Sequence, residues 1–212
     1  MAIPALKMAR QKDRATKLPR EFYTRANVVT VARELLGKLL VVPTDKGRRV
    51  SGTIVEVEAY RGPQDRAAHS YDGRRTKRTE TMYGIGGTAY VFFVYGMYYQ
   101  FNVVTNVPDA PHAVLIRAVE PQEGIDLMRK RRSGQSDHSL TNGPGKLCIA
   151  LGIDRQLDAA DLLSDRVWLE PGQTIPRSQI ASGPRIGIDY AEEWKDKPWR
   201  FWIRDNSFVS RQ

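Results

Sequence analysis

Two glutamates and a tyrosine alternate with apolar and small residues in the segment Gly52–Tyr60. The alternation predicts a β-strand, in which Glu56, Glu58 and Tyr60 project from one face at intervals of roughly 6.5 Å. Two carboxylates on one face could be the acid and base of a sugar hydrolase, and one alone could activate a water molecule. An edge strand with a solvated acidic face would explain the same residues without any chemistry.

The segment Thr88–Asn102 is unusually rich in aromatic residues. It predicts a β-hairpin that bends at Gly96 and carries rings on both faces. One face has Tyr90, Phe92 and Val94, and the other has Val91, Phe93 and Tyr95. Such a hairpin could be a core element buried on both sides. It could instead present rings that stack on bases and open a duplex, as some minor-groove proteins do.

The charge of the chain favours the second use of the hairpin. Its 212 residues include 33 lysines and arginines against 24 aspartates and glutamates, a net charge of +9. Positive charge attracts polyanions, and phosphate contacts supply most non-specific affinity for DNA. We therefore expect nucleic acid to be the partner.

The composition also limits cofactors and compartment. A single cysteine, Cys148, excludes an intrachain disulfide framework and argues against a thiolate zinc site. The histidines, His69, His112 and His138, are spaced too widely for a metal-ligand motif, so we expect no metal and no other cofactor. No apolar run approaches the roughly 18 residues of a membrane span, and no signal-peptide core is present. We expect an intracellular protein without a membrane partner, in a bacterial cytoplasm or a eukaryotic nucleus.

The elements that must position these residues fit one domain. We place it at residues 21–212, after a flexible basic tail of residues 1–20. Apolar residues at helical spacing predict a core-facing helix from Val28 to Leu36, with Asn27 as its N-cap and Gly37 after its end.

The remaining chain predicts strands joined by short helices and one long loop. Strands are expected at Lys38–Pro43, Arg49–Ala59, His112–Val119, Val167–Glu170, Arg185–Ile188 and Trp199–Arg204. Helices are expected from Pro121 to Arg132, from Pro144 to Leu151 and from Asp158 to Leu163. The aperiodic segment Arg61–Gly87 should form a wall of a pocket. The order indicates a single α+β domain with a curved, mostly antiparallel sheet, short flanking helices and a protruding β-hairpin. We expect this domain to be a monomer.

Five blocks of the chain stand in the order of one known family. They are Val-Glu-Val-Glu-Ala-Tyr (Val55–Tyr60), Ala-Ala-His-Ser (Ala67–Ser70), Val-Tyr-Gly-Met-Tyr (Val94–Tyr98), Leu-Ile-Arg-Ala-Val-Glu-Pro (Leu115–Pro121) and Gly-Pro-Gly-Lys-Leu-Cys (Gly143–Cys148). Together they resemble the alkyladenine DNA glycosylases, the 3-methyladenine DNA glycosylases of the mammalian type. The resemblance implies a monofunctional enzyme of base excision repair. Such an enzyme flips a damaged purine out of double-stranded DNA, hydrolyses its N-glycosidic bond and leaves an abasic site.

The resemblance assigns the catalytic and DNA-opening residues. Glu58 would activate the attacking water and Arg117 would orient it. Glu56 would then have a structural role. Tyr95 would intercalate from the minor groove into the gap that the flipped base leaves. The hairpin and its groove contacts would be supported by Met97 and Tyr98.

The base pocket implied by the resemblance has aromatic walls. Tyr60 would lie on one side of the base and His69 and Phe92 on the other, with backbone groups near Ala67 and His69 reading its edge. Asn102 would exclude normal guanine by a clash with its exocyclic amino group. The mammalian enzymes carry tyrosine where this chain has Phe92, a change that keeps stacking and removes a hydroxyl. The implied substrates are 3-methyladenine, 7-methylguanine, hypoxanthine and ethenoadenine.

Two other functions use part of the same pattern. A non-enzymatic architectural or damage-binding protein of the minor groove would need the basic surface and the hairpin. Glu58 argues against it, since a carboxylate near DNA repels phosphate unless it has a task. A sugar hydrolase would need the two glutamates, but it explains neither the charge nor the hairpin. Because no lysine falls in the matched pocket, we expect hydrolysis without strand cleavage.

Overall fold

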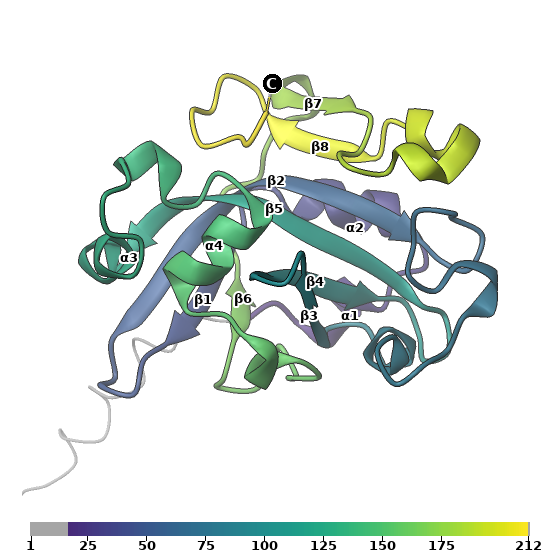
Figure 1. Cartoon of the computed structure of the whole chain (residues 1–212), viewed down its shortest axis with the longest axis horizontal. Helices are drawn as coiled ribbons and strands as arrows, with labels where there is room; N and C mark the ends of the chain where they lie inside the picture. The colour runs from purple at the N-terminus through teal and green to yellow at the C-terminus, as the bar shows by residue number, and fades with distance from the viewer. Residues whose placement is uncertain (1–16, 212) are drawn as a thin grey trace, which may run out of the picture.

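Two long antiparallel strands, β2 and β5, form the centre of the computed structural model, which describes residues 17–211. They belong to one eight-stranded sheet in which every pairing is antiparallel (Figure 1). The sheet continues from β5 through β4 to β3. The other edge of β2 pairs with β1 near its start and with β8 near its end, and β6 and β7 pair with β1 and β8. The strands are β1 Leu39–Pro43, β2 Arg49–Arg61, β3 Ala89–Val94, β4 Tyr98–Thr105, β5 His112–Glu123, β6 Trp168–Glu170, β7 Ile180–Gly183 and β8 Arg200–Ile203.

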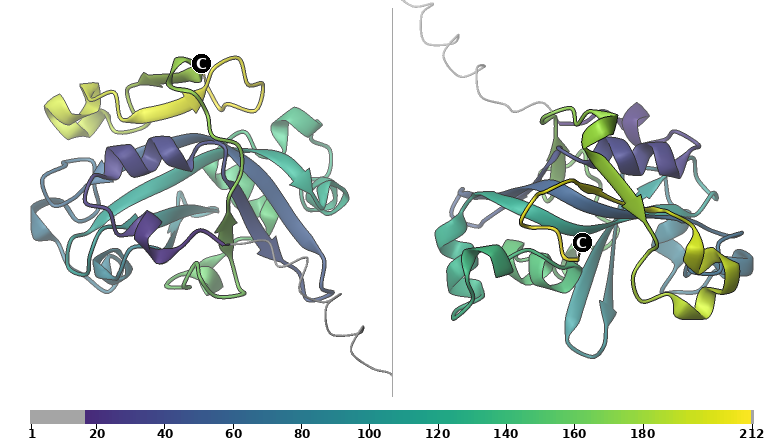
Figure 2. Two further views of the ribbon diagram at one scale, coloured as in Figure 1. Left: turned by 180° about the vertical axis from the view of Figure 1, so that it is seen from behind. Right: turned by 90° about the horizontal axis from the view of Figure 1, so that it is seen from above.

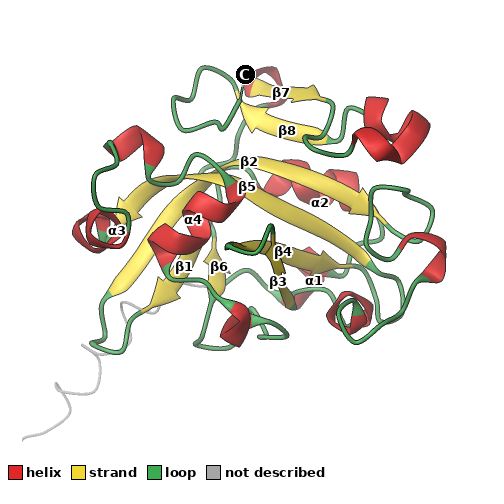
Figure 3. Ribbon diagram, in the orientation of Figure 1, coloured by secondary structure: helices red, strands yellow, loops and turns green. Residues whose placement is uncertain are grey.

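Short helices cover both faces of the central strands (Figure 3). α2 packs on β2 and β5 from one side, and α4 packs on β4 and β5 from the other (Figure 2). The α-helices are α1 Arg20–Tyr23, α2 Val28–Leu35, α3 Ile125–Arg131 and α4 Pro144–Leu151. Short 3-10 segments span Tyr71–Gly73, Glu80–Tyr83, Asp137–Ser139, Arg155–Leu157, Arg177–Gln179 and Asp189–Asp196. The predicted α+β domain with an antiparallel sheet is therefore confirmed. Within residues 17–211, none of the helices has the length and apolarity that a membrane crossing requires.

The helix predicted after Asn27 is α2, and its ends follow local rules. The Asn27 side chain accepts a hydrogen bond of 3.1 Å from the backbone N–H of Thr30, which satisfies one of the free donors of the first turn. Gly37 lies just beyond the helix with φ +81°, and a Cβ there would stand 2.2 Å from the carbonyl oxygen of Gln173. Only glycine fits this position, so the predicted C-terminal signal is confirmed.

The β3/β4 hairpin projects from the domain, as predicted (Figure 2). Its last ladder pair is Val94 with Tyr98, so the tip is a three-residue loop. Within it the Met97 N–H donates to the Val94 carbonyl at 3.3 Å, and the central residues Tyr95 and Gly96 have positive φ (+55° and +69°), as in a type I′ turn. Burial changes along its length: Tyr90 is 2% exposed, whereas Phe93 is 49%, Met97 63% and Tyr95 78% exposed. The hairpin is thus anchored in the core at its base and presents rings to solvent at its tip.

Most of the expected basic tail, residues 1–20, lies outside the described residues. Its last four residues pack on the domain. Lys17 Nζ donates to the carbonyl oxygen of Ser164 at 2.6 Å, Leu18 is buried, and α1 begins at Arg20.

The predicted start of a helix at Pro121 is wrong. β5 continues through Pro121 to Glu123, and Pro121 stands opposite Gly52 where the register of β2 and β5 shifts. Proline is tolerated in a sheet at such irregularities because it has no N–H to donate. Gly124, with φ +71°, ends the strand, and α3 begins at Ile125.

Two C-terminal predictions are also wrong. The expected helix Asp158–Leu163 does not form because its polar groups serve the edge of β3: Asp158 accepts from the Val91 N–H at 2.9 Å, and Ala160 accepts from the Ala89 N–H at 2.8 Å. The expected strand Arg185–Ile188 is not paired in the sheet, and the strand lies earlier, at β7. The other predicted strands and the helix Pro144–Leu151 are confirmed.

Candidate active site

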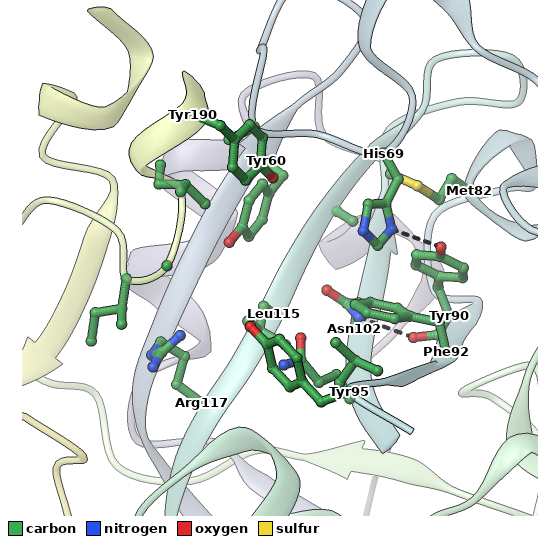
Figure 4. A pocket seen from close by; sticks show the side chains of 17 residues that line it. Tyr60, His69, Met82, Tyr90, Phe92, Tyr95, Asn102, Leu115, Arg117 and Tyr190 are labelled. Carbon is green, nitrogen blue, oxygen red and sulfur yellow. Dashed lines mark hydrogen bonds between the residues drawn. The ribbon is translucent and has the colours of Figure 1, made fainter. Parts of the chain in front are cut away.

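A cavity of about 210 Å³ opens between the end of β2, the β3/β4 hairpin and the segment after β7 (Figure 4). β5 forms its floor, and the segment Arg61–Gly87 contributes Ala67, His69 and Met82, so this loop forms a wall of the pocket as predicted. Seven of the ten residues with a role implied by the resemblance line the cavity: Tyr60, Ala67, His69, Phe92, Tyr95, Asn102 and Arg117.

Glu58 lies directly behind the cavity and is fully buried. Its Oε2 accepts a hydrogen bond of 2.7 Å from the Tyr60 hydroxyl, and its Oε1 accepts one of 2.7 Å from the backbone N–H of Ile186. Arg117 Nη1 stands 3.2 Å from the same Oε1. Tyr60, Ile186 and Arg117 all line the cavity, so the Glu58 carboxylate directly contacts three residues of the cavity wall.

Glu56 lies on the same face of β2 but belongs to a different set of contacts. Its carboxylate accepts from Arg200 Nη1 at 3.0 Å and from the backbone N–H of Ser210 at 2.7 Å, and Arg117 Nε stands 3.3 Å from it. Both glutamates are 0% exposed, so the solvated acidic edge strand is excluded. Burial alone would lower the pKa of Arg117, but Glu58 and Glu56 overcome that effect and raise it.

The wall opposite Tyr60 consists of His69, Tyr90 and Phe92. The Nδ1 of His69 and the Tyr90 hydroxyl are 2.9 Å apart, and the His69 and Phe92 rings meet edge to face with centroids 4.6 Å apart. Burial, with the nearby Arg78 and Arg74, lowers the pKa of His69 to about 4. His69 is therefore a neutral imidazole at pH 7.

Asn102 is fixed by the hairpin from which it projects. Its Nδ2 donates to the backbone carbonyl of Tyr90 at 3.2 Å, and the residue is 4% exposed (Figure 4). Burial raises the pKa of Tyr90 to about 12, so its hydroxyl stays protonated beside His69. At this end of the cavity, the hydrogen bond therefore fixes the position of the Asn102 side chain, and burial keeps Tyr90 in its neutral form.

The structure does not bring Met97 and Tyr98 to the cavity. Met97 is exposed at the hairpin tip. Tyr98 packs on the first turn of α4, where a Cβ on Gly145 would stand 2.9 Å from its ring. Their expected supporting role remains a prediction.

Comparison with known proteins identifies the family. A family model described as methylpurine-DNA glycosylase (MPG) matches residues 21–207. This chain belongs to the methylpurine-DNA glycosylase family. A protein of Desulfitobacterium hafniense (strain Y51), named "Putative 3-methyladenine DNA glycosylase", is 52% identical over 202 residues, which cover 92% of this chain and 98% of that protein. A protein of Clostridium acetobutylicum with the same name is 51% identical over 202 residues, covering 92% and 97%.

The resemblance seen in the five sequence blocks is therefore confirmed. Membership of this family makes the protein a DNA glycosylase, a hydrolase that acts on DNA. The purely architectural alternative does not agree with this membership. Among residues 17–211, no three side chains of histidine, cysteine, aspartate or glutamate gather closely enough to hold a metal ion.

Several residues of this candidate site were not predicted from the sequence. Tyr90 could have been found, because it shares a strand face with Phe92. Tyr190, 68% exposed at the mouth of the cavity, had no recognisable signal. Neither did the buried ion pair of Asp65 and Arg185, whose partners are 120 residues apart.

Proposed function

We propose that this glycosylase flips an alkylated or deaminated purine from double-stranded DNA into the cavity, hydrolyses its N-glycosidic bond and leaves an abasic site. One observation carries the proposal: the aromatic cavity ends at Arg117 and at the Tyr60 hydroxyl, both of which contact Glu58. The names of the two bacterial relatives specify 3-methyladenine, which supports an alkylated purine as the base.

The cavity supplies what a flipped purine needs. The Tyr60 ring on one side and the His69 and Phe92 rings on the other offer stacking partners, and stacking on aromatic side chains is worth roughly 1–3 kcal/mol per base. Tyr95, which stands at the exposed hairpin tip and also lines the cavity, would fill the gap in the duplex. These contacts compensate the few kcal/mol that extrusion costs.

The proposed chemistry is hydrolysis through an oxocarbenium-like sugar. The bond between the anomeric carbon and the base nitrogen breaks, and its electron pair leaves with the purine. Glu58 stabilises the positive charge that develops on the sugar. A water held beside Arg117 and the Tyr60 hydroxyl adds to the anomeric carbon, and its proton passes to the Glu58 carboxylate. A cationic methylated purine departs as a neutral base, so this sequence is balanced in charge.

Neutral bases such as hypoxanthine and ethenoadenine need an additional proton on leaving. His69 does not supply it at pH 7, because its pKa is lowered to about 4. We therefore expect 3-methyladenine and 7-methylguanine to be released faster than hypoxanthine and ethenoadenine. With Phe92 the chain also lacks the hydroxyl that the mammalian enzymes carry at this wall.

The reaction should stop at the abasic site. Strand cleavage by a glycosylase requires an amine nucleophile, and none of the described residues that line the cavity is a lysine. We also propose that the enzyme works as a monomer. Since the relatives named above are bacterial, the bacterial cytoplasm is the compartment that we favour.

The experiment that tests this function is single-turnover base release from duplexes that contain one 7-methylguanine or one hypoxanthine. Glu58→Gln should lower the rate by roughly 10²- to 10⁴-fold, as loss of a general base does, and leave binding intact. The control is Glu193→Gln, the same substitution at an exposed glutamate that does not line the cavity. Strands should stay intact until alkali is added. Unchanged excision by Glu58→Gln contradicts the role of Glu58. Tight binding without release from any lesion would favour the architectural protein.

A further inference from the structure

Asp65 and Arg185 form an ion pair whose side chains are both fully buried. Arg185 Nη2 donates to Asp65 Oδ1 at 2.9 Å, and Nη1 donates to Asp65 Oδ2. Arg185 also donates to the backbone carbonyls of Ala59 at 3.0 Å and Trp194 at 3.2 Å. Replacing a buried ion pair by apolar residues is often neutral or stabilising, so stability alone is a weak reason for these two charges to be here.

Arg185 supports one wall of the base cavity from behind. Its guanidinium carbon lies 4.7 Å from the centroid of the Tyr60 ring. Tyr60 lines the cavity and Arg185 does not, so the guanidinium covers the part of the ring that a base would not contact. The planar guanidinium and the hydrogen bond to the neighbouring Ala59 carbonyl together fix where this ring stands.

Asp65 holds the opposite part of the pocket. Its Oδ2 accepts from the backbone N–H of Arg61 at 3.1 Å, and its Oδ1 accepts from the backbone N–H of Ala67 at 3.0 Å. These bonds close the turn that leads from Tyr60 to His69. Asp65 does not line the cavity either, although Ala67 and His69 do.

We propose that the Asp65–Arg185 pair is a positioning device that sets the separation between Tyr60 and the loop carrying Ala67 and His69. Through the Tyr60 hydroxyl it also sets the orientation of Glu58. Its effect on excision rests on the proposed function, whereas its effect on the loop does not. A displacement of about 1 Å at a reacting centre can lower a rate by about 10²-fold, so neither residue has to touch the DNA to matter.

The test uses the double variant Asp65→Asn/Arg185→Gln, which removes both charges together and leaves neither unpaired. The control is Arg129→Gln/Asp137→Asn, an exposed pair with both side chains more than half accessible. We expect amide hydrogen exchange at Ala67 and Ala68 to accelerate by about tenfold or more, while exchange at Ile116 in β5 stays at the wild-type rate. Single-turnover release of 7-methylguanine should fall by roughly 10²-fold, and binding of undamaged duplex should not change.

A purely structural pair gives a different pattern, in which all slowly exchanging amides accelerate together and excision by the folded fraction stays normal. That result overturns the proposal, as does wild-type exchange at Ala67 and Ala68. If the wild type releases no base, the proposed function fails, but the exchange comparison still decides the positioning role. Arg185→Lys removes the planar group that packs on Tyr60. Because it keeps a positive charge beside Asp65, it does not leave that buried carboxylate unpaired. It should fold and excise slowly, and full activity would also overturn the proposal.

Discussion

The hydroxyl of Tyr60 donates a 2.7 Å hydrogen bond to Oε2 of Glu58, although the ring of the same tyrosine lines the base cavity. Burial, with the adjacent Glu58, raises the pKa of Tyr60 well above its ordinary value, so the phenol remains a donor at neutral pH. One side chain thus contacts both the space for the base and the carboxylate. Any shift of the ring that accompanies base binding is transmitted to Glu58.

Tyr60→Phe separates these two contacts. The ring remains as a stacking wall, but Glu58 loses a hydrogen bond to its charged group, worth about 1.5–3 kcal/mol. We expect single-turnover excision to slow by about 10- to 100-fold, with affinity for a damaged duplex nearly unchanged. Tyr60→Ala should lower both. The control is Tyr71→Phe, which removes a hydroxyl from an exposed tyrosine that does not line the cavity and should behave as wild type. Normal excision by Tyr60→Phe would show that the hydroxyl is dispensable.

Glu56→Gln should act on stability. Its carboxylate is fully buried against Arg200 and close to Arg117, so neutralising it leaves buried positive charge unbalanced. Breaking a buried pair in this way costs about 3–5 kcal/mol, measurable by urea unfolding. Glu193→Gln should leave the midpoint unchanged. A Glu56→Gln variant as stable as wild type but inactive would instead place Glu56 in the chemistry, as in a paired-carboxylate sugar hydrolase.

Local signals predicted the parts of the fold that depend on neighbouring residues. Asn27 and Gly37 bracket α2 because capping is decided within a few residues, and the bend at Gly96 follows from the positive φ of a tight hairpin turn. The segment that begins at Asp158 shows where prediction from local signals fails. A helix there would be locally acceptable, but the backbone of the β3 edge needs the Asp158 carboxylate, and this competition is not visible within the segment.

The sequence likewise predicted some features of the candidate site and could not predict others. Alternation along β2 placed Glu58 and Tyr60 on one face, and the structure agrees, because their side chains are hydrogen-bonded to each other. Alternation could not tell a solvated edge from the buried centre of a sheet, since that depends on pairing with β5 and β8. Arg185 escaped prediction because its contacts to Asp65 and Tyr60 join segments far apart in the chain.

His69 should make stability depend on pH. Its pKa is about 4 in the folded protein and about 6.5 in an unfolded chain, so below pH 6.5 the unfolded state binds a proton that the folded state does not. The contribution of neutral His69 is fully present above pH 6.5 and is lost as the pH falls through 4, up to about 3 kcal/mol in all. Unfolding free energies of wild type and His69→Asn, measured from pH 7 to 4, should converge towards the acid end. The variant of an exposed histidine, His138→Asn, should follow wild type. Parallel curves for His69→Asn would contradict the burial of this imidazole as a neutral group.

Tyr95 should matter for damaged DNA and not for folding. Its ring is 78% exposed, so substitution should change stability by no more than about 0.5 kcal/mol. Asparagine tolerates the positive φ of this position, so Tyr95→Asn removes the ring without adding backbone strain. Because an intercalated ring contributes stacking of about 1–3 kcal/mol, affinity for a hypoxanthine duplex should fall by about 10- to 100-fold. Affinity for undamaged duplex should stay within about twofold, since phosphate contacts carry it.

The matched control at the same tip is Met97→Ala, whose side chain is 63% exposed but does not line the cavity. Fluorescence titrations at one fixed salt concentration compare both variants on both duplexes. If Tyr95→Asn and Met97→Ala weaken damaged and undamaged binding equally, the tip is only a general contact with DNA. A selective loss with Tyr95→Asn, accompanied by slower single-turnover excision, is the outcome that intercalation requires, because only a ring that replaces the flipped base distinguishes the two duplexes.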